Sequence, residues 1–302
     1  MNNRWWIYQK ERFPLFAHGP LVIVFCLAVM LFSSMQQGDD LPGITRIAGA
    51  VISTLILFFQ LRVADEFKDY SIDALYRPHR AVPRGLVKLN ELARLAFAGA
   101  ALQFLIALSI DVGLIPILLV VWAYIGLMTR EFFVKEWLVK NPAVYLLSHM
   151  LVMPLIAFYV SSFDWLCDGC PIPSGLGWLL LLSFCLGLVL ELGRKIKVPA
   201  NERTGVETYS GLWGSNTAVI LWTAAVGASV FAYVNAASYL SESLFFLSVG
   251  GAVLALGLLT AVLFPGDGAR SLKGTEKLIE PSSGLVALML YLALGPLQAM
   301  FA

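Results

Sequence analysis

A chain of 302 residues that is 59% hydrophobic and only 14% charged is not an ordinary soluble domain, because such domains carry about 25% charged residues. Its mean hydropathy of +0.77 indicates an integral membrane protein, and its net charge of +1 favours no class of charged partner. Several apolar stretches reach the ~20 residues that a helix needs to cross the hydrocarbon. Their hydrophobicity is continuous and does not alternate, which excludes membrane β-strands, so we expect an all-α membrane protein.

The predicted elements begin with residues 1–14, where Trp, Tyr, Lys and Arg mix as is typical of a short helix lying in the membrane interface. No small-residue cleavage site accompanies the first apolar run, so we expect no cleavable signal peptide. Nine transmembrane helices are predicted after this segment, at about 15–35, 44–63, 89–110, 112–129, 142–162, 175–193, 214–236, 243–264 and 282–301.

The basic residues predict the orientation of these helices. With a cytoplasmic N-terminus, the segments on the cytoplasmic side and the adjoining helix ends hold 20 of the 21 Lys and Arg, and only Arg46 falls on the other side. We therefore expect a bacterial inner membrane protein whose C-terminus lies on the opposite side. The segments assigned to the cytoplasm are 1–14, 64–88, 130–141, 194–213 and 265–281.

The segment 64–88 concentrates acids at the end of the second predicted span. Asp65, Asp69 and Asp73 are spaced i, i+4, i+8, with Glu66 beside them, so a helix would place the three aspartates on one face. Like charges at this spacing repel one another, and the repulsion grows near the low dielectric of a bilayer. Bound cations would relieve it, and Mg²⁺ commonly bridges one or two carboxylates to a substrate phosphate.

Three arginines follow these acids directly, at Arg77, Arg80 and Arg84. Guanidinium groups match phosphate oxygens in geometry and charge. Acids that could hold Mg²⁺ beside arginines that could hold phosphate indicate a diphosphate site. The alternative is a solvated juxtamembrane helix with internal salt bridges, and composition does not separate the two.

The order of these residues resembles the first signature of the UbiA superfamily, the intramembrane prenyltransferases such as 4-hydroxybenzoate polyprenyltransferases. That signature reads N-D-x-x-D-x-x-x-D and then R-P-L-x-x-G. Asp and Glu replace the usual Asn and first Asp here, and Ala81 replaces the usual Pro. The matching stretches are Asp65-Glu66-x-x-Asp69-x-x-x-Asp73 and Arg80-Ala81-Val82-Pro83-Arg84-Gly85.

A second segment, 191–215, is similar to the family's second motif. "GVETYSGLWG" resembles the G-[IV]-x-[ST] stretch that follows two aspartates spaced D-x-x-x-D. Glu202 matches the second aspartate when one gap is allowed, whereas Val198 stands in place of the first, and Glu191 could replace it. The resemblance thus implies a weakened acidic motif, in which Arg194 and Lys195 provide some of the neutralisation of a second Mg²⁺. The alternative is a basic loop that follows the positive-inside rule.

Two further features are less specific. "YIGLMTREFFVKEW" loosely resembles the family's Y-x-x-x-K-R-x-T, with Arg130 in the basic position. His149 lies within the fifth predicted span, where an ionisable residue is a functional candidate by default. A neutral histidine that bonds to a neighbouring helix explains it equally well.

The resemblance implies one UbiA-like domain over residues 1–302, with nine helices around a central cavity and an active site at the cytoplasmic side. The implied reaction transfers an isoprenyl group from an isoprenyl diphosphate to a lipophilic acceptor, which could be aromatic. The expected partners are these two substrates and membrane lipid, and no nucleic acid is expected to bind. A terpene cyclase that needs no acceptor and a non-enzymatic carrier are the alternatives. The implied Mg²⁺ ligands are Asp65, Glu66, Asp69, Asp73, Glu191 and Glu202, of which Asp65, Asp69, Asp73 and Glu202 would be catalytic. The implied diphosphate ligands are Arg77, Arg80, Arg84, Arg130, Arg194 and Lys195.

Overall fold

The computed structural model describes residues 3–38, 41–167, 169–202, 205–240, 244–264 and 277–300, and the elements of these residues are helical. In chain order they are α1 (Arg4–Arg12), α2 (Leu15–Gln37), α3 (Ile44–Lys68), α4 (Tyr70–Tyr76), α5 (Leu89–Ile110), α6 (Leu114–Thr129), η1 (Glu131–Phe133), α7 (Lys135–Lys140), α8 (Pro142–Met150), α9 (Val152–Trp165), α10 (Leu176–Arg194), η2 (Pro199–Asn201), α11 (Tyr209–Trp213), α12 (Ser215–Ala237), α13 (Leu244–Leu263), α14 (Ile279–Leu294) and α15 (Pro296–Ala299).

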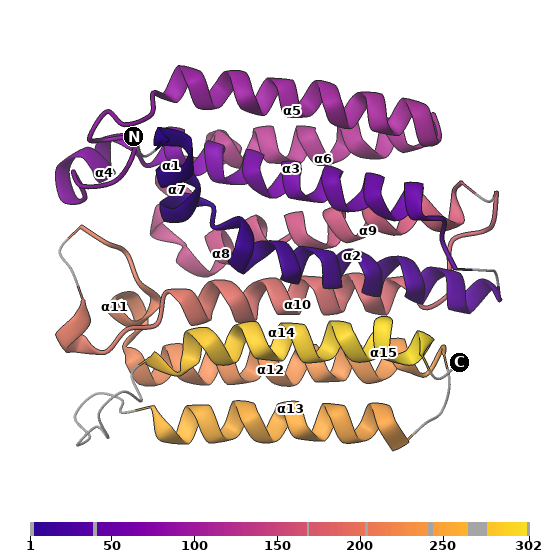
Figure 1. Ribbon diagram of the computed structural model, residues 1–302. Coiled ribbons are helices and arrows are strands. Elements are labelled where there is room, and N and C mark those ends of the chain that lie inside the picture. The colour runs from indigo at the N-terminus through magenta and orange to yellow at the C-terminus, as the bar shows by residue number, and fades with distance from the viewer. Residues whose placement is uncertain are drawn as a thin grey trace.

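The long helices run side by side as a bundle (Figure 1). Within the described residues, eight helices are long and apolar enough to cross a membrane, counting α8 with α9 and α14 with α15 as single spans. They correspond to eight of the nine spans expected from the sequence. The remaining one, predicted at 112–129, is α6, which has only 16 residues. At about 1.5 Å per residue it falls short of the ~30 Å hydrocarbon thickness, so nine full spans are not confirmed.

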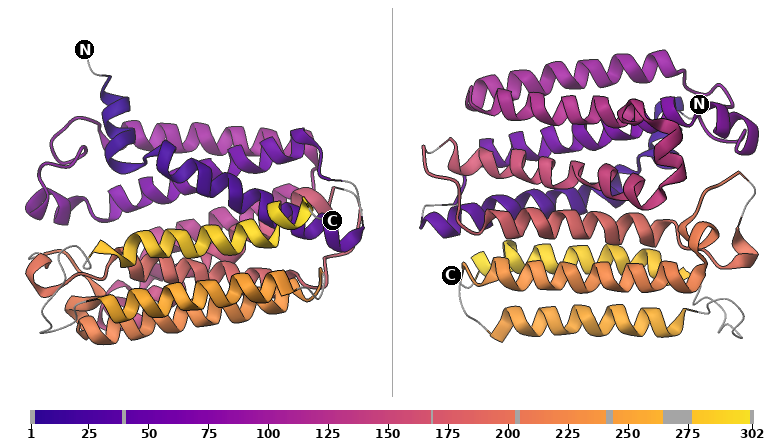
Figure 2. Two further views of the ribbon diagram at one scale, coloured as in Figure 1. Left: turned by 60° about the horizontal axis from the view of Figure 1, so that its bottom comes forward. Right: turned by 180° about the vertical axis from the view of Figure 1, so that it is seen from behind.

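The bundle has a buried centre and two outer helices. α5 and α13 form its opposite sides (Figures 1 and 2), and only 11% of the apolar window of α5 is buried, against 56% for α2 and α10. The core lies where α2, α9, α10, α12 and α14 pack together. Its fully buried large side chains include Phe32, Ile156, Tyr159, Leu179 and Trp222.

Short helices gather at one end of this bundle. α1, α4, α7 and α11 lie together there, whereas α15 lies at the other end (Figure 1). We refer to the end that carries these four helices as the motif end, because both motif segments of the sequence lie at it. α1 packs through Tyr8 into a small separate core with Val63, Ala81 and Leu92, so the N-terminal segment is anchored to the bundle.

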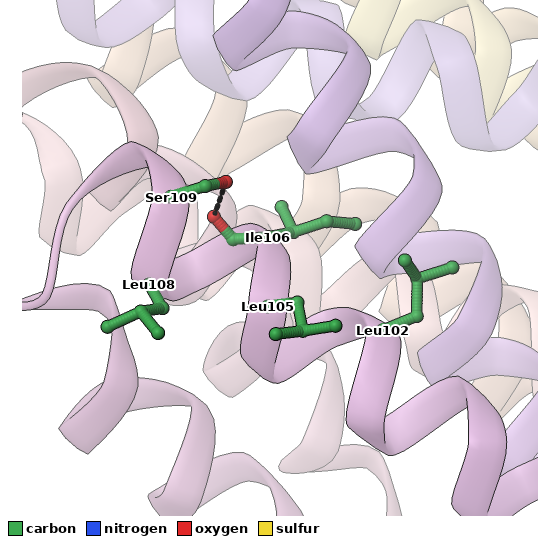
Figure 3. Close-up of a pocket in the computed structure, with 5 residues that line it drawn as sticks. All are labelled: Leu102, Leu105, Ile106, Leu108 and Ser109. Carbon is green, nitrogen blue, oxygen red and sulfur yellow. Dashed lines mark hydrogen bonds between the residues drawn. The ribbon is translucent and has the colours of Figure 1, made fainter.

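An apolar hollow of about 480 Å³ lies on the outer face of α5 (Figure 3). Four of its five lining residues are aliphatic, and the Ser109 hydroxyl donates to the Ile106 carbonyl oxygen of the same helix. Residues 102–109 belong to the half of α5 that points away from the motif end (Figure 1). The hollow offers no charged group to a diphosphate, so its composition suits a lipid chain. The central cavity expected from the sequence stays a prediction.

The close approach of α14 to α2 gives a test of this packing. A methyl group on Gly295 would lie 2.4 Å from Ala28 Cα, and backbone atoms cannot move aside as side chains do. We expect Gly295→Ala to cost about 1–3 kcal/mol, as overpacking does, and to lower the melting temperature of the protein in detergent. Gly284→Ala on the same helix is the matched control, since its methyl group meets nothing within 4 Å. Equal melting temperatures of the two variants would contradict this packing.

Candidate active site

The two motif segments contact each other at the motif end. Gly205 follows the second segment's Glu202 and packs against the Tyr76 ring at the end of α4, where a methyl group on Gly205 would lie 2.3 Å from Tyr76 Cδ2. Gly205 also has a φ of +75°, which side chains other than glycine rarely adopt. The chain thus needs glycine here for two reasons, and both serve the contact between the segments.

The three aspartates keep the predicted helical spacing across a change of direction. α3 ends at Lys68 and α4 begins at Tyr70, yet the Asp69 amide donates to the Asp65 carbonyl at 2.9 Å and the Asp73 amide to the Asp69 carbonyl at 2.8 Å. The turn of the helix therefore continues through Asp69. The surroundings of the three aspartates nevertheless differ, because nearby cations neutralise them to different degrees.

Asp73 is surrounded by guanidinium groups. Its side chain is only 2% exposed, and its carboxylate lies 2.6 Å from Arg80, 3.1 Å from Arg77 and 3.9 Å from Arg12. A buried carboxylate needs this much compensation, since an unpaired buried charge is very costly. The predicted grouping of Arg77 and Arg80 with the acids is present, and both arginines keep part of their side chains exposed.

Glu66 contacts the N-terminal helix, where it shares the Arg12 guanidinium with Asp73. Its carboxylate forms an ion pair with Arg12 of α1, and both side chains are almost fully buried. Arg12 was not among the residues that we selected from the sequence, because it precedes the motif by more than fifty residues. The only available signal was its position at the end of a segment predicted to lie in the membrane interface.

Asp65 and Asp69 are less fully neutralised. Asp65 is 41% exposed and lies 3.5 Å from Arg62. Burial raises the pKa of Asp69, and the negative charges of Asp65 and Asp73 raise it further, whereas the ammonium groups of Lys68 and Lys195 act in the opposite direction. Lys195 belongs to the second motif segment, so the two segments share one electrostatic field.

The second segment contains two glutamates in opposite situations. Glu191 accepts from Arg194 at 2.6 Å and from Lys195 at 2.9 Å, so its charge is compensated within its own helix end. Glu202 instead accepts from the hydroxyl groups of Thr208 and Ser210, at distances of 2.6 to 2.7 Å. Within the described part of the chain, no Lys or Arg nitrogen makes a salt bridge with Glu202 or Asp69.

Two of the predicted diphosphate ligands, Arg84 and Arg130, do not contact the acids of the motif segments in the described structure. Arg84 donates to Glu11 of α1 at 2.8 Å, so it helps to fix the N-terminal helix. Arg130 is exposed just after α6, and its backbone amide caps that helix. Of the six predicted basic ligands, Arg77, Arg80, Arg194 and Lys195 remain beside the acids. Their assignment to a diphosphate stays a prediction.

The geometry leaves Asp69 and Glu202 as the carboxylates with most capacity for a further cation. Across the residues that the structure describes, no three His, Cys, Asp or Glu side chains converge closely enough to hold a metal ion by themselves. A metal at this site would therefore depend on oxygen atoms from a second molecule. Arg77 and Arg80 beside Asp73, and Arg194 and Lys195 beside Glu191, provide positive charge at the same end of the bundle.

The model of the UbiA prenyltransferase family matches residues 11–272 of the chain. The protein belongs to the UbiA prenyltransferase family. This match confirms the family expected from the two motif segments and covers most of the described helices. The family is one of prenyltransferases, which confirms the prediction that the protein is an enzyme. A search of curated proteins gave no match.

Three solved structures resemble this UbiA protein over most of their length. An apo UbiA homologue from Aeropyrum pernix K1 has a TM-score of 0.68 at 12% identity and covers 93% of this chain and 97% of its own. A structure described as digeranylgeranylglyceryl phosphate synthase has a TM-score of 0.60 at 15% identity, covering 96% and 97%. A UbiA homologue from Archaeoglobus fulgidus, bound to DMAPP and Mg²⁺, has a TM-score of 0.59 at 12% identity, covering 95% and 97%. At these identities the likeness confirms the fold.

The raised pKa of Asp69 predicts a pH-dependent stability. Because this pKa is higher in the folded than in the unfolded chain, ionised Asp69 opposes folding at neutral pH. We expect Asp69→Asn to raise the melting temperature at pH 7 in a chelating buffer. The gain shrinks as the pH falls toward the ordinary aspartate pKa of 3.8, because below that pH the carboxyl is protonated in both the folded and the unfolded chain.

Thermal unfolding of detergent-solubilised protein between pH 4 and pH 8 measures this difference. Glu136→Gln is the matched control, because Glu136 is an exposed carboxylate on α7 and its removal has no such effect. A lower melting temperature for Asp69→Asn at pH 7 would mean that Asp69 has a stabilising cationic partner.

Proposed function

We propose that this UbiA protein transfers an isoprenyl group from an isoprenyl diphosphate to a lipophilic acceptor in the membrane, with Mg²⁺, and releases diphosphate. The observation that carries the proposal is the contact between the two motif segments at Gly205 and Tyr76. It brings the half-buried, incompletely neutralised Asp69 within the electrostatic influence of Lys195 from the facing segment. Acids and bases from two distant parts of the sequence meet at one end of an apolar bundle. A diphosphate with its cation would fit such a site, and its prenyl tail would fit the bundle.

The residues present suit Mg²⁺ that is shared with a substrate. Mg²⁺ prefers oxygen ligands and is usually held by one or two carboxylates together with phosphates and water. Asp69 and Asp65 in the first segment and Glu202 in the second are the carboxylates with free capacity. Glu66, Asp73 and Glu191 already have arginine or lysine partners, so we assign them to positioning those cations.

The basic residues keep donors for a diphosphate even in their ion pairs. Arginine has five N–H donors, and Arg80 uses one of its nitrogens on Asp73. The side chains of Arg194 and Lys195 are 51% and 34% exposed, so both can reach a ligand at the motif end. The carboxylates that hold these cations prevent them from repelling each other when no substrate is present.

The proposed chemistry is mainly electrostatic. The bond between C1 of the prenyl chain and the diphosphate oxygen breaks, and its electron pair leaves with the diphosphate. Positive groups that stand in place before the reaction stabilise this developing charge without further reorganisation. Mg²⁺, when bound, supplies Lewis acidity at the phosphate oxygens. The A. fulgidus relative with DMAPP and Mg²⁺ supports this proposal through its shared fold.

Diphosphate release tests the proposal directly. Purified protein is incubated with Mg²⁺ and dimethylallyl, geranyl or geranylgeranyl diphosphate, each with and without candidate acceptors. We expect release that stops in a chelator and returns with Mg²⁺. Asp69→Ala is expected to lower it at least about 100-fold, the scale on which a preorganised charge acts. Glu136→Gln is the matched acidic control and keeps full activity.

The products separate the candidate reactions. A prenylated acceptor supports transfer, whereas a cyclic or linear hydrocarbon formed equally without acceptor would make the protein a terpene cyclase or diphosphate lyase. The assignment of this site would be overturned if no donor gave diphosphate release. It would also be overturned if the Asp69→Ala variant released diphosphate as fast as the unchanged protein.

A further inference from the structure

The segment that joins α6 to α8 presents lysines and aromatic rings at its surface, and the proposed reaction assigns no role to them. Lys135, Trp137 and Lys140 of α7 are exposed, and so is Phe133 just before that helix. Glu136 is the one exposed acid between residues 130 and 140, so the exposed part of the segment has a positive net charge. We refer to Phe133, Lys135, Trp137 and Lys140 as the α7 surface.

A turn of rare backbone conformation leads into this surface. Glu131, Phe132 and Phe133 have φ values of 51°, 51° and 62°, in the left-handed region that residues other than glycine seldom adopt. Glu131 fixes the turn to the bundle, because its side chain is 7% exposed and accepts from the Tyr145 hydroxyl at 3.0 Å. Phe133 is nevertheless 74% exposed. The turn thus buries an acid and exposes a phenylalanine, which is the opposite of what water favours.

The place of α7 in the bundle explains this arrangement. α7 lies at the motif end (Figure 1), and the membrane span Pro142–Trp165 begins two residues after α7 ends. Val144 and Leu147 in the first turns of that span are 40% and 46% exposed, and their spacing places them on one face of α8. Such a face of a membrane span meets lipid chains. The α7 surface therefore lies where the lipid-facing side of the bundle reaches the headgroups.

The two lysines of the α7 surface are not neutralised by the protein. Lys135 and Lys140 form no salt bridge with any residue that the structure describes. Most other cations of the motif end do have an acidic partner, such as Asp73 for Arg80. Leu138 is the only buried residue of α7, so the rest of the helix is open to whatever surrounds the bundle.

We propose that the α7 surface binds anionic lipid headgroups, with Lys135 and Lys140 on the lipid phosphates and Phe133 and Trp137 among the upper parts of the acyl chains. Aromatic rings and lysines together are typical of the membrane–water interface, where the apolar stem of a lysine lies along lipid and its ammonium group reaches the headgroups. The cytoplasmic leaflet has a negative surface potential, so this inference agrees with the orientation that the basic residues predict. It concerns lipid alone and does not depend on the proposed reaction.

The charge of the α7 surface favours an anionic lipid over other occupants. A zwitterionic lipid has a cation of its own beside its phosphate, which offsets the attraction to lysine. A soluble phosphate would leave Phe133 and Trp137 in water. An anionic lipid satisfies both requirements, because its phosphate and its acyl chains belong to one molecule.

A lipid titration of the full-length protein in non-ionic detergent tests the inference. The melting temperature is measured at rising mole fractions of palmitoyl-oleoyl phosphatidylglycerol and, in parallel, of phosphatidylcholine with the same chains. A lipid that binds only the folded protein raises the melting temperature. We expect phosphatidylglycerol to act at lower mole fractions than phosphatidylcholine, and about 0.5 M sodium chloride to reduce the difference by screening.

Substitution of the two lysines locates the binding. Each cation near an anionic leaflet contributes about fivefold in affinity, so we expect the midpoint of the phosphatidylglycerol titration to rise about 25-fold in the double variant Lys135→Gln, Lys140→Gln. The double variant Lys135→Arg, Lys140→Arg is the matched control, because it retains both charges and keeps the midpoint within about twofold. Melting temperatures without added lipid report on the folding of both variants.

Tryptophan quenching tests the aromatic part of the surface independently. Bromine atoms on an acyl chain quench the fluorescence of an indole ring that they contact. The chain has eight Trp residues, so the signal of Trp137 is the difference between the unchanged protein and Trp137→Phe. We expect brominated phosphatidylglycerol to quench this difference signal more strongly than brominated phosphatidylcholine at equal mole fractions.

Three results would overturn the inference. One is an equal titration midpoint for the two lipids. Another is a preference for phosphatidylglycerol that the glutamine double variant retains, which would place the headgroups elsewhere, for example on the arginines of the motif end. The third is a rise in melting temperature with soluble glycerol phosphate that equals the effect of the lipid and requires the same lysines. None of these measurements needs catalysis, so failure of the proposed function leaves them unaffected.

Discussion

The motif end depends on one constraint, which is that carboxylates at the edge of an apolar bundle must be neutralised. A buried unpaired charge costs several kcal/mol, and this UbiA protein has at least six acids close together there. Most of them obtain a cation from the chain itself. Arg80 and Arg77 neutralise Asp73, and Arg194 and Lys195 neutralise Glu191. The fold of the loops follows from the need to bring these partners together.

The same need to neutralise carboxylates explains why the N-terminal helix α1 packs at the motif end. α1 is amphipathic and lies across the motif end, where Arg12 reaches Glu66 and Asp73. Glu11 pairs with Arg84 and Arg4 pairs with Glu91, so four ion pairs and the buried Tyr8 ring hold α1 in place. A segment predicted to lie in the membrane interface thus also contributes ion pairs to the acids and arginines of the motif end. The acids that it leaves under-compensated, Asp69 among them, are the ones available to a substrate cation.

Local patterns predicted much of this structure. Continuous apolar runs predicted the long helices to within a few residues at most ends, and the four-residue spacing of the aspartates predicted a helical turn that the backbone maintains. The predicted span at 112–129 begins earlier than α6, which starts at Leu114. The chain turns at Asp111 and Gly113, and the hydrophobicity of the sequence alone does not show this turn. Contacts between residues far apart in the sequence could not be predicted from such local patterns. Neither the turn of Glu66 toward Arg12 nor the left-handed backbone at Glu131 follows from any periodicity, since both are fixed by tertiary packing.

Lys68 shows how one residue can help to neutralise two separate carboxylates. The half-buried carboxylate of Asp69 needs positive charge nearby, and so does the buried carboxylate of Glu131 in η1. The ammonium group lies 3.5 Å from Glu131 and 2.6 Å from the Tyr145 hydroxyl, and its charge also acts on Asp69. Its position at the last turn of α3 makes this possible, because side chains at successive residues of a helix point in different directions. The same lysine therefore offsets part of the negative charge of two separate carboxylates, so removing it would leave both with less neutralisation than the apolar surroundings require.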